Sequence, residues 1–128
     1  MILLDSTFLI DLIRGKKETL KIINSKESLL TTQINMYEVI KGLFLKNITS
    51  SKFVEIIEMF NNIKVLPLDD SAVIKSAEIY ADLTKKGIEI HNFDCIIAGT
   101  ALSKGINTIV TKNADHFKRI KELKIEAY

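Results

Sequence analysis

Short apolar runs alternate along the chain with longer segments in which apolar residues recur every three or four positions. The short runs predict buried β-strands, and the longer periodic segments predict amphipathic helices. The predicted strands span residues 1–4, 28–31, 63–68, 106–110 and 124–127. The predicted helices span residues 8–15, 16–24, 33–46, 50–61, 70–87, 92–102 and 117–121.

This alternation predicts an α/β protein whose strands form a central parallel sheet. Right-handed crossovers between parallel strands place helices on both faces, so we expect a three-layer α/β/α sandwich. The 128 residues are enough for one sizeable core, and neither an internal repeat nor a linker interrupts them. We therefore expect a single domain over residues 1–128.

The predicted helix at residues 92–102, NFDCIIAGTAL, is apolar around its whole circumference except for one charge. A helix of this kind is buried in the protein interior. Its charge, Asp94, lies in the first turn behind the candidate cap Asn92. An acid at this position either interacts with the helix dipole or enters the core, where it needs a hydrogen bond, an opposite charge or a bound cation.

Acidic and amide side chains follow two predicted strands or lie early in predicted helices. Asp5 ends the first strand, and Asn113 and Asp115 follow the fourth. Asp94 and Glu38 lie in the early turns of their helices, and Glu38 shares one side of its helix with apolar residues. Because ligands bind beyond the carboxyl ends of the strands in sheets of this kind, we expect these side chains to meet at one edge.

Carboxylates gathered at one site repel each other unless a cation offsets their charge. A ligand set made only of oxygens suits Mg²⁺ or Mn²⁺. A zinc site is not expected, because His91 and His116 are isolated from each other and from Cys95, and we interpret both as surface or loop residues. Cys95 itself lies in the buried helix, so we interpret it as inert packing rather than as a nucleophile.

Composition and charge narrow the class of protein. The chain is 47% hydrophobic and 27% charged, which is typical of globular proteins, and its net charge of +2 is too small to indicate nucleic-acid binding by itself. No apolar run is long enough to span a membrane, and the first residues, MILLDS, lack the charged region of a signal peptide. The lone Cys95 cannot form an internal disulfide. We therefore expect a cytoplasmic protein without membrane association.

Four segments of the chain together resemble one family of enzymes. They are MILLDSTFLIDLIRG, TTQINMYEVIKG, NFDCIIAGTAL and INTIVTKNADHFKRI. In this order and spacing they resemble the PIN-domain ribonucleases, specifically the toxin component of VapBC-type toxin–antitoxin modules, over essentially the whole chain. The resemblance implies a PIN-like fold and an endoribonuclease that depends on Mg²⁺ or Mn²⁺ and cleaves RNA phosphodiesters with a metal-activated water.

The resemblance also implies roles for individual residues. Asp5, Glu38 and Asp94 occupy the first three acidic positions of the family, which makes them candidate catalytic residues and metal ligands. At the fourth position, where many members have an acid, this chain has Asn113, and Asp115 follows two residues later. Both are candidate catalytic residues. Because an amide replaces the acid at the fourth position, the sequence leaves open whether a second metal binds.

Thr7 and Thr111 stand at polar positions of the family pattern, which makes them candidate substrate-binding residues. Arg14 and Lys16, just past the helix that follows Asp5, either contact substrate phosphates or are ordinary surface charges. The family resemblance implies three partners: an RNA substrate, a cognate antitoxin protein and a second copy of the chain in a homodimer. Apolar residues on the helices between 33 and 61 offer surface for such partners.

Two other interpretations remain open from the sequence. One is a catalytically inactive PIN-fold module that binds RNA or protein, which only Asn113 supports. The other is a receiver-like, Mg²⁺-dependent phosphoacceptor domain, because Asp69 and Asp70 follow the third predicted strand and Lys112 follows the fourth. This second interpretation leaves Glu38 and Asp94 without a role.

Overall fold

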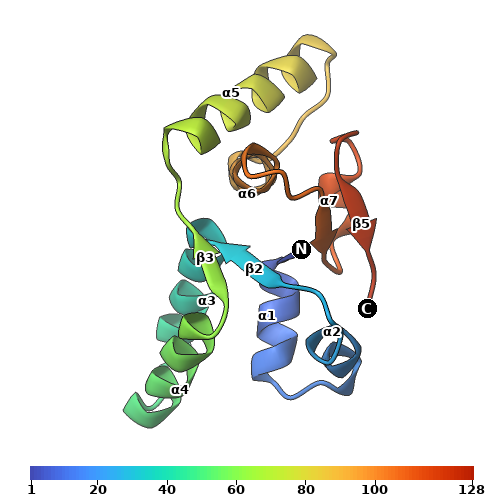
Figure 1. Ribbon diagram of the computed structural model, residues 1–128. Coiled ribbons are helices and arrows are strands. Elements are labelled where there is room, and N and C mark those ends of the chain that lie inside the picture. Colours follow the sequence, from blue (N-terminus) through green and yellow to red (C-terminus); the bar gives the residue numbers. More distant parts are fainter.

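A computed structural model describes residues 1–128 and contains one five-stranded sheet (Figure 1). The strands are β1 (Ile2–Leu4), β2 (Leu29–Thr32), β3 (Lys64–Leu66), β4 (Thr108–Val110) and β5 (Lys124–Glu126). All neighbouring strands pair in parallel, in the order β3-β2-β1-β4-β5. Each predicted strand is present, although β3 and β4 are shorter than the apolar runs that predicted them.

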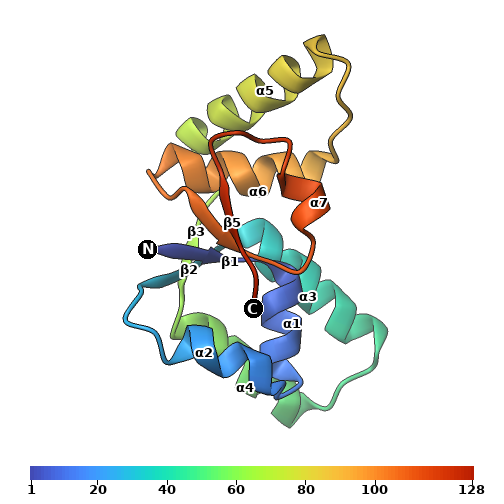
Figure 2. The ribbon, with the colours of Figure 1, turned by 90° about the vertical axis from the view of Figure 1, so that its right-hand side faces the viewer.

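Helices cover both faces of this sheet (Figure 2). They are α1 (Ser6–Ile13), α2 (Leu20–Ile23), α3 (Gln33–Leu45), α4 (Ser50–Asn61), α5 (Asp70–Lys85), α6 (Asn92–Ser103) and α7 (Ala114–Phe117), with a 3₁₀ turn η1 (Lys17–Thr19) before α2. Helices α1 to α4 lie on one face, and α5 to α7 lie on the other. The predicted three-layer α/β/α class is therefore confirmed.

Alternate residues along each strand point to opposite faces and build two separate cores. On β1, Ile2 and Leu4 pack with α1 to α4, whereas Leu3 packs with α5 to α7. The same alternation separates Val110 from Ile109 on β4. Strand β1 is thus buried on both faces, which explains why its sequence is continuously apolar.

The strand order changes direction along the chain between β1 and β4. From β1, the chain adds β2 and β3 on one side and then returns to place β4 and β5 on the other. Leu4 pairs with Val110, so both strands end at the same level. The residues that follow them, Asp5 and Thr111, therefore lie side by side at the position where parallel α/β sheets bind ligands.

Two helix predictions need correction. The predicted helix at 117–121 begins earlier, as α7, because the N–H of His116 already bonds to the carbonyl of Asn113 at 3.0 Å. The buried residues Phe117 and Ile120 have helical spacing, but Ile120 belongs to a turn that closes on the carbonyl of Phe117. The predicted helix at 16–24 is likewise divided into η1 and α2.

Helix α6 lies between α5 and the sheet (Figure 1). It approaches α5 tightly at Gly99, where an added Cβ atom would stand 2.6 Å from Cα and 2.7 Å from the backbone N of Ser76. The thiol of Cys95 also donates to the carbonyl of Ser76 at 3.1 Å. Cys95 is 2% exposed, as expected for packing in a buried helix, and no helix of the structure is long and apolar enough to cross a membrane.

Candidate active site

Asp5 lies where β1 ends and α1 begins, and it is only 4% exposed. Its Oδ2 accepts the hydroxyl of Thr111 at 2.6 Å, and its Oδ1 accepts the side-chain amide of Asn35 at 3.1 Å. Burial raises the pKa of Asp5, and the hydrogen bonds from Thr111 and Asn35 oppose the rise. The backbone N–H of Ser6 also opposes the rise, so Asp5 is a buried carboxyl group that several donors help to keep ionised.

Glu38 lies on α3, and its carboxylate lies near that of Asp5. Its Oε1 accepts the hydroxyl of Ser6 at 2.8 Å, and Ser6 in turn accepts the amide of Asn35 at 2.9 Å. Burial raises the pKa of Glu38, and the nearby charges of Asp5 and Asp94 raise it further. A solvated helix glutamate would not have this environment, so Glu38 belongs to the acidic cluster.

Asp94 lies in the first turn of α6, and its Oδ2 is 3.2 Å from Nδ1 of His116. Burial raises the pKa of Asp94, as does the charge of Asp5, while the imidazole of His116 lowers it. Burial thus raises the pKa values of all three carboxyl groups, and the charges of neighbouring acids raise those of Glu38 and Asp94 further.

These acids line one cavity of about 420 Å³. Its other lining residues are Ser6, Thr7, His91, Asn92, Phe93, Asn113 and His116. Four sequence segments therefore meet at one edge of the sheet, as the positions of Asp5, Glu38, Asp94 and Asn113 predicted.

Other candidates from the sequence lie elsewhere. Asp115 does not line the cavity; its side chain is 85% exposed and its Oδ1 accepts Nζ of Lys118 at 2.8 Å. Arg14 and Lys16 are exposed and follow the far end of α1, about 12 Å along the helix from Asp5 at 1.5 Å per residue. The structure therefore brings none of these three residues to the acidic cluster.

Thr7 and Thr111 organise the loop after β4. Thr111 is 2% exposed, and its hydroxyl accepts the N–H of Asn113 at 2.9 Å while it donates to Asp5. Thr7 accepts the N–H of Lys112 at 3.1 Å and lines the cavity. Burial makes Thr111 a support for Asp5 and for the loop, rather than a residue open to substrate.

Two further features of the site were not predicted from the sequence. The expectation that His91 and His116 are isolated from each other is wrong: their ring centroids are 6.2 Å apart and both line the cavity. Asn35, which is 0% exposed, was missed altogether, although its spacing of four from the buried Val39 marks the inner side of α3. A buried amide at such a position requires polar partners.

The donor atoms of the acidic cluster determine which cation the site fits. No three His, Cys, Asp or Glu side chains stand close enough to enclose a metal ion by themselves. The donors are hard carboxylate oxygens around an open cavity, and repulsion between them raises their pKa values. This set fits Mg²⁺ or Mn²⁺ carrying several waters, because such ions use few direct carboxylate ligands.

The arrangement does not support a receiver-like phosphoacceptor site. Asp69 caps α5, accepting the N–H of Ala72 at 3.0 Å, and pairs with Lys104 at 2.6 Å. Lys112 pairs instead with Asp11 at 2.7 Å. The residues that suggested this alternative therefore lie outside the acidic cavity.

The chain matches the PIN domain family over residues 2–123, and it belongs to that family. It is 29% identical over 128 residues to Ribonuclease VapC1 of Methanocaldococcus jannaschii, which covers 99% of this chain and 86% of the relative. It is 30% identical over 128 residues to the tRNA(fMet)-specific endonuclease VapC of Salmonella typhimurium, covering 97% of this chain and 95% of the relative.

A solved structure has the same fold. VapBC2 from Rickettsia felis, bound to a DNA fragment from its promoter, superimposes with a TM-score of 0.86 at 21% identity, covering 100% of this chain and 99% of that one. The resemblance inferred from the four sequence segments is therefore confirmed.

Proposed function

We propose that this protein is an endoribonuclease that depends on a divalent metal and acts as the toxin of a toxin–antitoxin pair. The observation that carries the proposal is the meeting of Asp5, Glu38 and Asp94 at one cavity of a PIN-domain fold. The two relatives described above are named as a ribonuclease and a tRNA-specific endonuclease, which supports RNA as the substrate class.

In this proposal Asp5, Glu38 and Asp94 would hold the cation together with waters, since they do not enclose it by themselves, and Asn113 would be the fourth polar side chain at the site. When bound, the cation supplies positive charge for the phosphate oxygens and acidity for a nearby water. Ser6 orients Glu38 by donating to it, which keeps the carboxylate facing the cavity.

His116 lines the cavity and its imidazole contacts Asp94, so we assign it the role of positioning that carboxylate. Asn35 has a similar role on the opposite side: it donates both to Asp5 and to Ser6. These contacts hold the acids close together although the acids repel one another.

The test is RNA cleavage by the purified protein and by Asp94→Asn in the presence of Mn²⁺ or Mg²⁺. The variant should lose metal-dependent cleavage while retaining its fold, and Glu38→Gln should weaken metal binding in a titration. Asp70→Asn is the matched control, since Asp70 also lies in the first turn of a helix but far from the cavity. Cleavage by Asp94→Asn at the wild-type rate would disprove the assignment.

For the partners, we propose an antitoxin segment and a second copy of the chain. The support is an apolar groove of about 600 Å³ on α3, whose exposed residues include Tyr37, Phe44 and Leu45. Light scattering at micromolar concentration tests the homodimer, and a pull-down from the native host with the tagged protein tests the antitoxin. A monomer in the first experiment would reject the dimer.

A further inference from the structure

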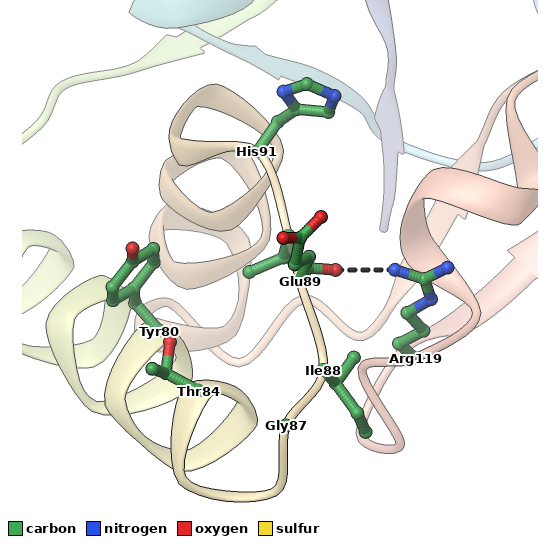
Figure 3. Close-up of a pocket in the computed structure, with 8 residues that line it drawn as sticks. Tyr80, Thr84, Gly87, Ile88, Glu89, His91 and Arg119 are labelled. Atoms are coloured by element: carbon green, nitrogen blue, oxygen red, sulfur yellow. Dashed lines mark hydrogen bonds between the residues drawn. The ribbon is translucent and has the colours of Figure 1, made fainter.

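A second cavity adjoins the acidic one. It has a volume of about 600 Å³. Its lining comes from α5, from the connection between α5 and α6, and from the turn that follows α7. The lining residues are Tyr80 and Thr84 on α5, residues 87–91 in the connection, and Arg119 in the turn. Figure 3 shows segment 87–91 running between Tyr80 and Arg119. Its last residue, His91, also lines the acidic cavity, so the two cavities meet at this side chain.

The guanidinium of Arg119 is held at this cavity by a backbone carbonyl and not by a salt bridge, although its charge also acts on the exposed Asp115. Its Nη1 donates to the backbone carbonyl of Glu89, as the dashed line in Figure 3 marks, and Arg119 takes part in none of the ion pairs of the protein. By contrast, the adjacent Lys118 is paired with Asp115. A carbonyl acceptor fixes the position of Arg119 but leaves its full charge and its other N–H donors available.

We propose that this cavity binds a nucleotide of the RNA next to the phosphodiester that lies at the acids. This inference rests on the proposed ribonuclease function and adds a substrate subsite to it. Arg119 contacts the phosphate of that nucleotide, and the exposed ring of Tyr80 offers a surface on which the base stacks. His91 marks the passage between the two cavities.

Electrostatics favour a positively charged side chain in a cavity beside the acids. The acidic cavity carries three carboxyl groups, which repel the phosphates of an approaching strand unless positive charge lies beside them. Among the cations near this edge, Arg119 is unpaired and points into a cavity.

Glu89 also lines this cavity, and its carboxylate bears on the charge of the phosphate group that the cavity suits. One cation together with one anion suits a singly charged phosphodiester better than a free phosphate dianion. Glu89 also offers an acceptor for a ribose 2′-hydroxyl, the group that distinguishes RNA from DNA.

The experiment uses an oligoribonucleotide that spans the cleavage site mapped with the wild-type protein on total tRNA, together with shorter versions cut back from either end. Arg119→Ala should raise KM about tenfold with kcat retained, and lower the slope of log KM against log salt by about 0.7, as expected for one lost single-strand phosphate contact. Tyr80→Ala should raise KM similarly, whereas Tyr80→Phe should behave as wild type. On the shortened substrate that lacks the bound nucleotide, wild type and Arg119→Ala should be equal.

Lys118→Ala is the matched control, because it removes the same charge one residue away and should leave KM and the salt slope unchanged. Arg119→Lys should restore most of the salt slope. Unchanged KM for both Arg119→Ala and Tyr80→Ala would overturn the subsite. A fall in kcat for Arg119→Ala without a change in KM would overturn it as well, because Arg119 would then only support segment 87–91. Wild-type protein that cleaves no RNA would instead overturn the proposed function, and this inference with it.

Discussion

The hydroxyl of Thr111 donates a hydrogen bond of 2.6 Å to Oδ2 of Asp5, and this contact joins the carboxyl ends of β4 and β1. Burial raises the pKa of Asp5, and the bond from Thr111 is the strongest of the contacts that oppose the rise. The same hydroxyl accepts the N–H of Asn113. One buried side chain therefore both favours the ionised form of Asp5 and places the loop after β4.

Replacing Thr111 by valine keeps the shape of the side chain and removes the hydroxyl. Thr111→Val should lower the free energy of unfolding by about 1.5–3 kcal/mol, the usual contribution of a hydrogen bond to a charged group. It should also raise the pKa of Asp5 further, so activity should begin to fall at a higher pH on acidification. Urea unfolding and a pH–rate profile measure the two effects.

Thr108→Val serves as the control for this substitution, since Thr108 lies on β4, the strand that Thr111 follows, and its hydroxyl contacts only the exposed Asn107 at 3.5 Å. A Thr111→Val protein with the pH profile of Thr108→Val would show that the hydroxyl does not act on Asp5.

The raised pKa of Asp94 predicts how its removal affects stability. Because the pKa of the folded state lies above the unfolded value of 3.8, ionised Asp94 destabilises the folded protein at neutral pH, and this penalty disappears as the pH falls towards 3.8. In EDTA at pH 7, Asp94→Asn should therefore melt at a higher temperature than wild type, and the gap should close on acidification. Adding Mg²⁺ should raise the Tm of wild type but not of the variant.

Two glycine positions predict opposite effects of the same substitution. Gly99→Ala should destabilise the protein by about 1–3 kcal/mol, because the new Cβ meets the backbone of Ser76 and forces α5 and α6 apart. Gly42→Ala, also within a helix, meets nothing within 4 Å and should stabilise it by about 0.5–1 kcal/mol. Thermal unfolding of both variants checks the pair, and equal Tm values would contradict the tight contact between α5 and α6.

The layered fold could be predicted because the spacing of apolar residues depends on which faces of each strand and helix are buried. The continuous apolar run at residues 2–4 reports a strand buried on both faces, and the apolar circumference of residues 92–102 reports the buried helix α6. Boundaries were less predictable where buried residues belong to turns. Phe117 and Ile120 have the spacing of a helix, yet they anchor a turn.

The acids of the site were predictable because each lies next to an element whose direction fixes its position. The contacts between them were not, since they depend on how the layers pack. His91 and His116 are 25 positions apart in the sequence, and they meet only because α7 lies beside the start of α6. Asn35 shows a similar limit: its buried position on α3 can be read from spacing, but its bond to Asp5 depends on the pairing of β2 with β1.

The loop after β4 allows a prediction about the fourth position of the site. Asn113 lines the acidic cavity, and its side chain makes no capping bond to α7, so it is free to face the cavity. Asn113→Asp adds a carboxylate there and should tighten Mn²⁺ binding, because the added charge attracts the cation. Isothermal titration of the variant against wild type measures this effect.

Asp115→Ala is the companion variant. The N-cap position of α7 is Asn113, and Asp115 is exposed, is paired with Lys118 and does not line the acidic cavity. Its replacement should leave both turnover and Tm close to wild type. A sharp loss of turnover at an unchanged Tm would mean that the loop rearranges to bring Asp115 to the cation. In that event Asn113→Asp should leave Mn²⁺ affinity unchanged, so the two variants together decide which side chain occupies the fourth position.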